Sequence, residues 1–152
     1  MLKEGDAAPD FQLQDECGCT LSLKNFRGHP LVIYFFPRAD TPGCTIEAKE
    51  FGAIFGKFQK EKAAVVGVSP DTPEAQAKFK KKYDLPFTLL CDTEHKMAEA
   101  YGVWREKNLY GKKVMGVART TFVIDAKGRI KKIFEKVKPE GHAAEVLAAL
   151  QS

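Results

Sequence analysis

The chain has 152 residues, of which 44% are hydrophobic and 29% charged, the size and composition of one folded domain. Its net charge of +4 comes from 24 basic and 20 acidic residues, without the basic stripe and interleaved aromatic residues of a nucleic-acid interface. No apolar stretch approaches the roughly 18 residues of a membrane span, and the N-terminus has no signal-peptide core. We therefore expect a single cytoplasmic domain over residues 1–152, with no nucleic-acid or membrane partner.

The first part of the chain predicts an N-terminal β-hairpin. Residues 11–14 alternate apolar and polar side chains, the segment 20–23 does the same, and a glycine-containing turn separates them. Residues 25–30 are expected to form a loop with one short helical turn. Residues 31–36, LVIYFF, are apolar without alternation, which is typical of a strand buried on both faces.

After this strand the pattern changes to that of a long helix, since the apolar residues at 44, 48, 51, 55 and 58 share one helical face. An apolar strand follows at 63–68, and strand, helix and strand of this kind form a right-handed parallel crossover. The remaining expected elements, in chain order, are a helix from 71 to about 83, a strand at 86–90, a short helix at 94–101, a loop or irregular hairpin over 104–116, antiparallel strands at 122–124 and 130–134, and a terminal helix at 139–150.

Cys44 stands at the start of the long helix. Thr41 suits the N-cap and Pro42 the first helical position, which places Cys44 in the first turn. There it lies among unpaired backbone N–H groups at the positive end of the helix dipole, which favours the thiolate, the nucleophilic form of cysteine. A cysteine at the head of an apolar helical face is also commonly an inert core residue. Position alone therefore leaves a reactive and a structural cysteine both open.

The neighbours of Cys44 carry a more specific signal. Pro37, Thr41 and Cys44 stand as Pro-x-x-x-Thr-x-x-Cys directly after the buried strand, which resembles the active-site signature of the peroxiredoxins. The wider run YFFPRADTPGCTIEA resembles the bacterioferritin-comigratory, or Q-type, branch of that family. The resemblance extends from the APDF segment at 8–11 to the RTTFVID segment that begins at Arg119. It implies an α/β, thioredoxin-like fold with a central mixed β-sheet flanked by helices, to which the N-terminal β-hairpin is added.

The resemblance also implies an activity, that of a thiol-dependent peroxidase reducing hydrogen peroxide and alkyl hydroperoxides through a sulfenic acid at Cys44. In that reading Pro37 shields the cysteine, the hydroxyl of Thr41 binds the peroxide, and Arg119 stabilises the thiolate and the departing oxygen. The backbone N–H groups of Gly43 and Cys44 add donors at the helix start. From the residues alone, Thr41 also fits a plain helix cap, Pro37 a strand terminator and Arg119 a surface ion pair.

Glu47 lies one helical turn after Cys44. A carboxylate at that position would raise the pKa of the thiol by repulsion unless an arginine paired with it. Two interpretations therefore remain open: an ion pair between Glu47 and Arg119, or an ordinary acidic residue that interacts favourably with the helix dipole.

The sulfenic acid must return to a thiol, and here the chain departs from the familiar pattern. Many Q-type members place a second cysteine five residues after the first, where this chain has Lys49, and another group places it in the following helix, whose stretch 75–83 has none. Three cysteines remain. Cys91 ends a strand expected at the same sheet edge as the active site, whereas Cys17 and Cys19 lie at an accessible hairpin turn. The sequence leaves open whether one of them or an outside thiol resolves the sulfenic acid.

No metal ion and no organic cofactor is expected. Cys17 and Cys19 lack a partner pair at zinc-finger spacing, and the three histidines, His29, His95 and His142, are scattered along the chain. None of the histidines neighbours a candidate nucleophile in sequence, so we expect all three at the surface.

By resemblance, the electrons come from thioredoxin, glutaredoxin or a small thiol, and the protein is a monomer or a homodimer. Two alternatives to a peroxidase remain. One is a thioredoxin-like disulfide oxidoreductase, although no Cys-x-x-Cys follows the first buried strand and Thr120 stands where thioredoxins usually have a proline. The other is a non-enzymatic, redox-sensitive binding module in which Cys44 is structural.

Overall fold

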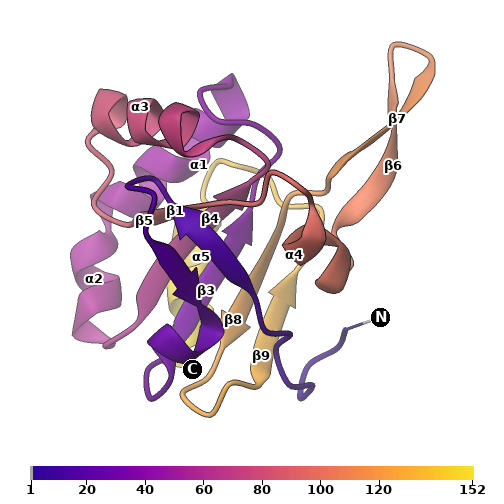
Figure 1. The fold of residues 1–152 in the computed structure, drawn as a ribbon. Helices are drawn as coiled ribbons and strands as arrows, with labels where there is room; N and C mark the ends of the chain where they lie inside the picture. The colour runs from indigo at the N-terminus through magenta and orange to yellow at the C-terminus, as the bar shows by residue number, and fades with distance from the viewer. Residues whose placement is uncertain (1) are drawn as a thin grey trace.

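The computed structural model describes residues 2–152, without the side chain of Leu109. They form a seven-stranded mixed sheet in the order β2-β1-β5-β4-β3-β8-β9 (Figure 1). The three central strands, β3, β4 and β5, are parallel, and the outer strands are antiparallel to their neighbours. The strand bounds are β1 Gln12–Asp15, β2 Thr20–Ser22, β3 Leu31–Phe35, β4 Ala64–Ser69, β5 Thr88–Cys91, β8 Thr120–Ile124 and β9 Ile130–Phe134. The expected thioredoxin-like sheet and its added N-terminal hairpin are confirmed.

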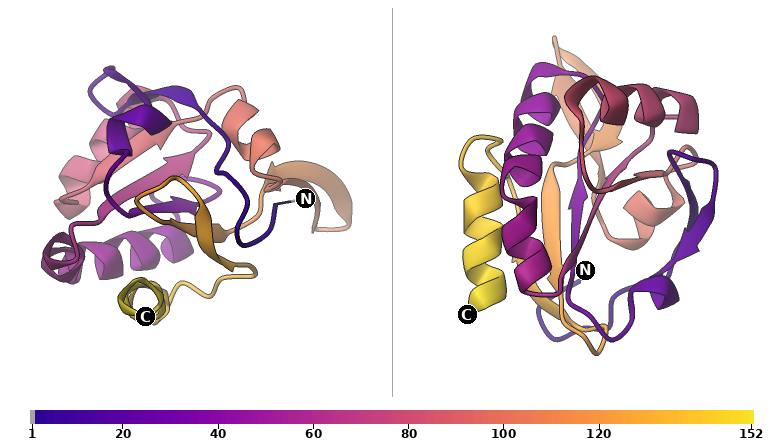
Figure 2. Two further views of the ribbon diagram at one scale, coloured as in Figure 1. Left: turned by 90° about the horizontal axis from the view of Figure 1, so that it is seen from below. Right: turned by 90° about the vertical axis from the view of Figure 1, so that its left-hand side faces the viewer.

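The helices cover both faces of this sheet. α1, α2, α3 and α5 pack on one face, and α4 packs on the other together with the N-terminal segment. Figure 2 shows α1 and α5 side by side on their face, in purple and yellow. The helix bounds are α1 Pro42–Ala53, α2 Phe55–Lys60, α3 Pro73–Tyr83, α4 Lys96–Ala100 and α5 His142–Gln151, with a short 3₁₀ helix at Leu23–Phe26. None of the helices within residues 2–152 is long and apolar enough to cross a bilayer.

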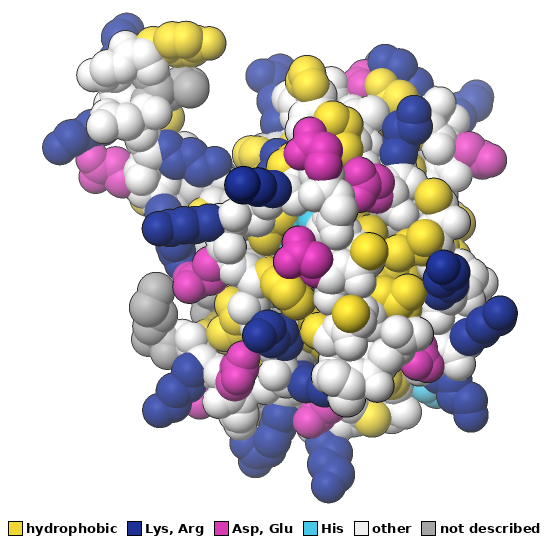
Figure 3. Space-filling model, turned by 180° about the vertical axis from the view of Figure 1, so that it is seen from behind, with side chains coloured by type: hydrophobic (Ala, Val, Ile, Leu, Met, Phe, Trp, Pro, Cys, Tyr) yellow, Lys and Arg dark blue, Asp and Glu magenta, His cyan; other side chains and the backbone are white. Residues whose placement is uncertain are grey.

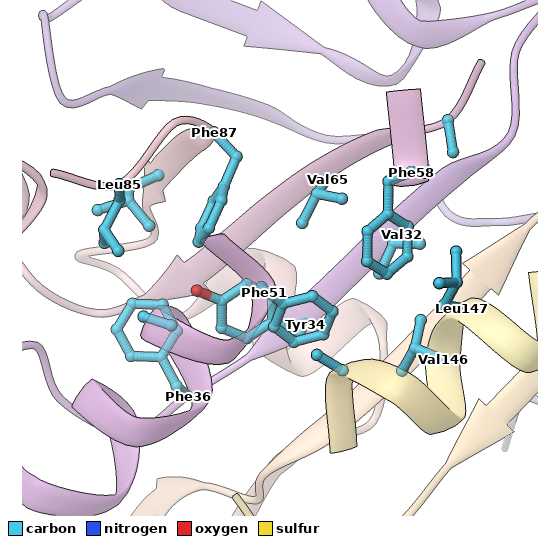
Figure 4. Packing of buried hydrophobic residues seen from close by; sticks show 14 of the residues in the cluster. Val32, Tyr34, Phe36, Phe51, Phe58, Val65, Leu85, Phe87, Val146 and Leu147 are labelled. Atoms are coloured by element: carbon cyan, nitrogen blue, oxygen red, sulfur yellow. The ribbon is translucent and has the colours of Figure 1, made fainter. Parts of the chain in front are cut away.

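The apolar run 31–36 is buried throughout because both faces of β3 are covered. Successive side chains alternate between the two cores. On the α1 side, Tyr34 stacks on Phe51 with ring centroids 4.7 Å apart, and Phe36 and Phe87 complete an aromatic cluster (Figure 4). This packing fixes α1, and with it the residues at its start, relative to the end of β3.

The prediction of one long helix after β3 was wrong, because the helix breaks at Ile54, whose φ is −112° and ψ is 17°. Glycines flank the break at Gly52 and Gly56, and glycine lowers helix propensity. Gly52 also lies against the Pro86 ring, 3.3 Å from the position its Cβ would occupy. Phe58, in the short second helix, still reaches the same core as Phe51, so the apolar spacing persists across the break.

The segment 104–116 forms a regular hairpin rather than a loop or an irregular one. β6 (Trp104–Leu109) and β7 (Lys112–Val117) pair in continuous antiparallel register. The turn residues Tyr110 and Gly111 have φ of 53° and 77°, as a two-residue type I′ turn requires. The hairpin projects from the body (Figures 1 and 3), and the sequence did not reveal it because most of it packs against no core.

Candidate active site

The candidate site lies at the edge of the sheet where β3, β4 and β5 end. β3 leads through the half-buried Pro37 into the first turn of α1. The antiparallel strand β8 begins at this edge, because its first residue, Thr120, pairs with Phe35, the last residue of β3. Arg119 immediately precedes β8 and so lies beside the start of α1. The register of β3 with β8 therefore joins Arg119 to Cys44, although 75 residues separate them.

Arg119 contacts both Cys44 and Glu47. Its Nη2 donates to the Cys44 Sγ at 3.4 Å, and its Nη1 donates to the Glu47 Oε1 at 2.7 Å. The Glu47 side chain is 0% exposed, Cys44 is 1% exposed, and the Arg119 side chain is 17% exposed. Of the two interpretations of Glu47, the structure therefore has the ion pair, and the interpretation of Arg119 as part of a surface ion pair was wrong.

The surroundings of this ion pair are apolar enough to change how it titrates. Burial raises the pKa of Glu47 to about 7, although the charge and the hydrogen bond of Arg119 act in the opposite direction. Burial also raises the pKa of Tyr34 well above its usual value, and the charges of Glu47 and Cys44 add to that shift. The Tyr34 hydroxyl and the Glu47 Oε2 are buried without a hydrogen-bond partner among the described residues. The guanidinium of Arg119 is thus the cation in direct contact with both Cys44 and Glu47.

Gly43 leaves the space that Arg119 occupies. A Cβ on Gly43 would lie 3.1 Å from the Arg119 Nη2 and 3.4 Å from the Pro139 Cγ. The guanidinium can therefore lie directly against the first turn of α1. In that turn the N–H groups of Gly43 and Cys44 have no intrahelical acceptor, so the helix start and Arg119 present donors to the same small volume.

Thr41 occupies the N-cap position of α1 with an extended backbone, but its side chain does not cap the helix. The hydroxyl instead donates to the backbone carbonyl of Arg38, with an Oγ1 to O distance of 2.8 Å. The interpretation of Thr41 as a plain cap was therefore wrong. Because its hydrogen is engaged, the hydroxyl has only lone pairs to offer, and it can accept a hydrogen bond from an incoming O–H group.

Sequence reasoning missed a second cation near the site, Lys107 of β6. Its side chain is half-buried and lies across Gly116 of the paired strand, with the Cδ 3.3 Å from the position a Cβ would occupy. Burial lowers the pKa of Lys107, and the positive charge of Arg119 lowers it further. Nothing in the sequence pointed to this residue, because its place depends on the hairpin that the pattern did not resolve.

The expectation that all three histidines lie at the surface was wrong for His142. This residue begins α5, is 1% exposed, and hydrogen-bonds through Nε2 to the Thr121 Oγ1 at 2.8 Å. Its ring meets the Phe51 and Phe134 rings edge-on. Burial lowers the pKa of His142 to about 4, and the charge of Arg119 contributes. A signal was available, since His142 stands four residues before Val146 on the apolar stripe of α5.

Cys91 lies at the same sheet edge, two strands away from β3. It is the last residue of β5 and is buried, and it pairs with Ser69 of β4 and Gln14 of β1. Its Sγ donates to the backbone carbonyl of Asp15 at 3.8 Å. Burial raises the pKa of Cys91 to about 12, with further increments from the nearby acidic residues. Cys91 is thus a protonated thiol held inside the sheet.

Cys17 and Cys19 lie in the exposed turn between β1 and β2, and both are free. Their backbone N–H groups both donate to the Asp15 Oδ1, at 2.8 and 2.9 Å. The possible ligand atoms of Asp15, Glu16 and Cys17 lie within 4.8 Å of one another. That is three groups, whereas a structural zinc site takes four. The structure brings Cys44, Arg119, Glu47, Gly43 and Thr41 into one site and leaves these two cysteines on another part of the sheet.

The fold and this arrangement match a known family. The family model described as AhpC/TSA matches residues 4–133. The chain belongs to this family, as a peroxiredoxin of the bacterioferritin-comigratory or Q type, and it is a thiol-dependent peroxidase. The resemblance seen in the sequence is thereby confirmed. Membership in a family of peroxidases favours this function over the two alternatives, a disulfide oxidoreductase and a non-enzymatic binding module.

Particular relatives cover nearly the whole chain. Peroxiredoxin Bcp of Bacillus subtilis is 46% identical over 150 residues, which are 99% of this chain and 96% of the relative. Peroxiredoxin Bcp of Escherichia coli is 41% identical and covers 96% of this chain and 94% of its own length. Among solved structures, the Bacterioferritin Comigratory Protein of Xanthomonas campestris, described for its alkyl peroxide reduction activity, superimposes with a TM-score of 0.91 at 38% identity, over 99% of this chain and 96% of that one.

Proposed function

We propose that Cys44 is the residue oxidised by peroxide, and that Arg119, Thr41, Gly43 and Pro37 build its substrate site. The observation that carries this proposal is the 3.4 Å contact between the Arg119 Nη2 and the Cys44 Sγ at the first turn of α1. A guanidinium and a helix N-terminus both stabilise a thiolate, and the thiolate is the attacking form. Glu47 acts through Arg119, because its carboxylate fixes the other end of the guanidinium.

The chemical step follows from these positions. The Cys44 thiolate attacks one oxygen of the hydroperoxide, an S–O bond forms as the O–O bond breaks, and the products are a cysteine sulfenic acid and an alcohol or water. Negative charge gathers on the departing oxygen, which takes up a proton. Arg119 and the N–H groups of the first turn are positioned to stabilise that charge. Thr41 accepts a hydrogen bond from the peroxide, because its own hydrogen is donated to the Arg38 carbonyl.

Hydrogen peroxide and alkyl hydroperoxides are the proposed substrates, and a thiol is the proposed reductant. Alkyl peroxide reduction is the activity described for the Xanthomonas campestris relative. The reductant is thioredoxin, glutaredoxin or a small thiol. A thiol, either external or from a resolving cysteine of this chain, condenses with the sulfenic acid and releases water, and a further thiol reduces the resulting disulfide. We propose that the protein acts in this way as a monomer or a homodimer.

Replacement of Cys44 by serine tests the proposal. We expect Cys44→Ser to abolish consumption of hydrogen peroxide and cumene hydroperoxide in the presence of excess dithiothreitol. The matched control is Cys91→Ser, which removes a buried thiol at the same sheet edge and should leave the rate unchanged. If Cys44→Ser consumed peroxide at the wild-type rate, the proposed site would be wrong.

A further inference from the structure

Regeneration of Cys44 is the step that the site itself does not provide for, because none of the side chains that the structure places in contact with the Cys44 Sγ is a thiol. Cys91 is nearest in the topology but poorly suited to the task. It is paired on both sides within the sheet, is buried, and has a pKa raised to about 12 by burial, so little thiolate forms there. Cys17 and Cys19 are instead exposed in a turn, so access to their sulfurs is not restricted, although the charge of Glu16 raises the pKa of Cys17.

The turn that carries Cys17 and Cys19 is held against α3, the helix that also contacts the Cys44 loop. Glu16 is 6% exposed at its side chain, binds the Lys80 Nζ at 2.8 Å and accepts the N–H of Leu89. One helical turn further along α3, the Tyr83 hydroxyl donates to the Asp40 Oδ1 at 2.7 Å, next to Thr41. α3 thus connects the loop of the reactive cysteine to the turn of the exposed pair.

The first turn of α1 is only weakly stabilised by its own residues. Its first four residues, Pro-Gly-Cys-Thr, include three of low helix propensity, and its N-cap side chain makes no capping hydrogen bond. The first turn is held by the Thr45 N–H bond to the Thr41 carbonyl at 2.8 Å, by burial of Cys44 in the core, and by the contact of Arg119 with the Cys44 sulfur. Oxidation to a sulfenic acid removes the negative charge from that sulfur and weakens the contact. The chain from Pro37 to Cys44, when extended, then spans roughly 25 Å. This exceeds the roughly 14 Å from β3 across β4 and β5 to β1, the strand that leads into the cysteine turn.

We propose that Cys17 and Cys19 form a resolving relay for Cys44, an inference that rests on the proposed function. After α1 begins to unwind, a thiol of the turn condenses with the Cys44 sulfenic acid, forming an S–S bond and releasing water. The second thiol of the turn, as thiolate, then attacks its neighbour's sulfur, forms the Cys17–Cys19 disulfide and expels Cys44 as thiolate. The expelled Cys44 thiolate regains Arg119 and the helix start as α1 re-forms, whereas the turn carries Asp15 and Glu16, so exchange moves the disulfide outward. An external dithiol reduces the exposed disulfide.

The test is intact and peptide mass after one equivalent of hydrogen peroxide, with dilute protein and no reductant. Wild type and Cys91→Ser should lose two hydrogen atoms and yield a Cys17–Cys19 disulfide. Cys17→Ser should trap a Cys44–Cys19 disulfide and Cys19→Ser a Cys44–Cys17 disulfide. The double variant C17S/C19S should gain one oxygen, react with dimedone at Cys44, and consume the first equivalent of peroxide at the wild-type rate.

Three outcomes would overturn the relay. They are a disulfide in C17S/C19S, a wild-type sulfenic acid that persists, and a linkage between two copies in a mixture of isotopically labelled and unlabelled protein. In each case Cys44 still reacts, so failure of the relay is distinguishable from failure of the proposed function, which Cys44→Ser reports.

The tether to α3 supplies an independent test. Lys80→Ala should slow disulfide formation about fivefold, as loss of a partly shielded ion pair predicts, without changing the rate of peroxide consumption. Lys96→Ala, which breaks the exposed pair with Glu94, should change neither rate. Equal rates of disulfide formation in Lys80→Ala and wild type would show that the ion pair with α3 does not position the cysteine turn for reaction with Cys44.

Discussion

The two cysteine regions of this molecule have opposite surroundings. Cys44 is 1% exposed, sits at a helix start, and receives a hydrogen bond from Arg119. Cys17 and Cys19 are exposed in a turn whose other side chains include Asp15 and Glu16. The charge of Glu16 raises the pKa of Cys17, and burial and Asp15 add to that effect.

Under the proposed function, the two regions are suited to different reactants. A buried thiolate beside a fixed cation suits attack on a small neutral peroxide, whose departing oxygen needs donors. The neighbouring carboxylates raise the pKa of Cys17 and so slow its reaction with peroxide, whereas exposure makes both turn cysteines accessible to a protein reductant. Substitutions around Cys44 should leave the Cys17–Cys19 turn unchanged, so that turn serves as an internal reference in each experiment.

Arg119→Met should have the largest effect on the buried side. It removes the cation beside Cys44 and leaves Glu47 without its partner, so the second-order rate constant with hydrogen peroxide should fall about 10²–10³-fold. The measurement is stopped-flow kinetics, with alkylation of Cys17 and Cys19 by iodoacetamide as the unchanged reference. Arg105→Met, which breaks an exposed pair with Glu135, is the control and should keep the rate. A rate for Arg119→Met within threefold of wild type would remove Arg119 from the mechanism.

Glu47 and His142 should give opposite pH dependences of stability. Burial raises the pKa of Glu47 from 4.5 to about 7, so its contribution to stability is present below pH 4.5 and is lost as the pH rises to 7. Burial lowers the pKa of His142 from 6.5 to about 4, so its contribution is present above pH 6.5 and is lost as the pH falls to 4. Each contribution amounts to at most about 3 kcal/mol, and in wild type the two largely offset each other.

Urea unfolding at pH 5 and pH 7 checks this pair. Glu47→Gln should be more stable at pH 7 than at pH 5, and His142→Gln should show the reverse. The double variant should return to the nearly level profile of wild type. If the free energy of unfolding changed with pH in the same direction in both single variants, the opposite pKa shifts assigned to Glu47 and His142 would be contradicted. At a given pH, the rate at which iodoacetamide alkylates Cys17 and Cys19 should be the same in these variants as in wild type.

Gly43→Ala should lower the peroxide rate about tenfold, because the added Cβ would lie 3.1 Å from the Arg119 Nη2 and displace it by a few tenths of an ångström. Gly56→Ala is the matched control in α2, where a Cβ meets nothing within 4 Å. It should keep the rate and raise stability by about 0.5–1 kcal/mol through helix propensity. Equal rates for the two variants would mean that Arg119 does not depend on the close approach at Gly43.

Tyr34→Phe should have the smallest effect. The hydroxyl is buried without a hydrogen-bond partner among the described side chains, so its removal deletes an unpaired polar group from the core. We expect a free energy of unfolding unchanged or raised by up to about 1 kcal/mol, and a peroxide rate within twofold of wild type. A loss of stability of about 2 kcal/mol or more, measured by urea unfolding, would instead indicate that the hydroxyl pairs with the Glu47 carboxylate.

Much of the fold could be predicted because its signals are local. The unbroken apolar run 31–36 marks the central strand, and Thr41-Pro42 marks where α1 begins. The break at Ile54 was missed because the apolar spacing continues across it, and spacing does not register the approach of Gly52 to the Pro86 ring.

The site was harder to predict, because its contacts join distant parts of the chain. The resemblance supplied Arg119, but the complete burial of Glu47 was unexpected, since a charged side chain is rarely fully buried. His142 was predicted at the surface because histidine is polar, although its position on the apolar stripe of α5 indicated burial. Lys107 depends on the β6–β7 register, which polar residues do not specify.

The tip of the projecting hairpin is a suitable site for inserting a tag. Tyr110, at its tip, is 97% exposed, and the strands leading to it pair with each other rather than with the seven-stranded sheet. Exposed loop tips are where inserted segments are best tolerated. A short peptide epitope or a fluorophore-binding tag placed between Tyr110 and Gly111 would therefore report on the whole enzyme from a point that leaves the helices and the core unmodified.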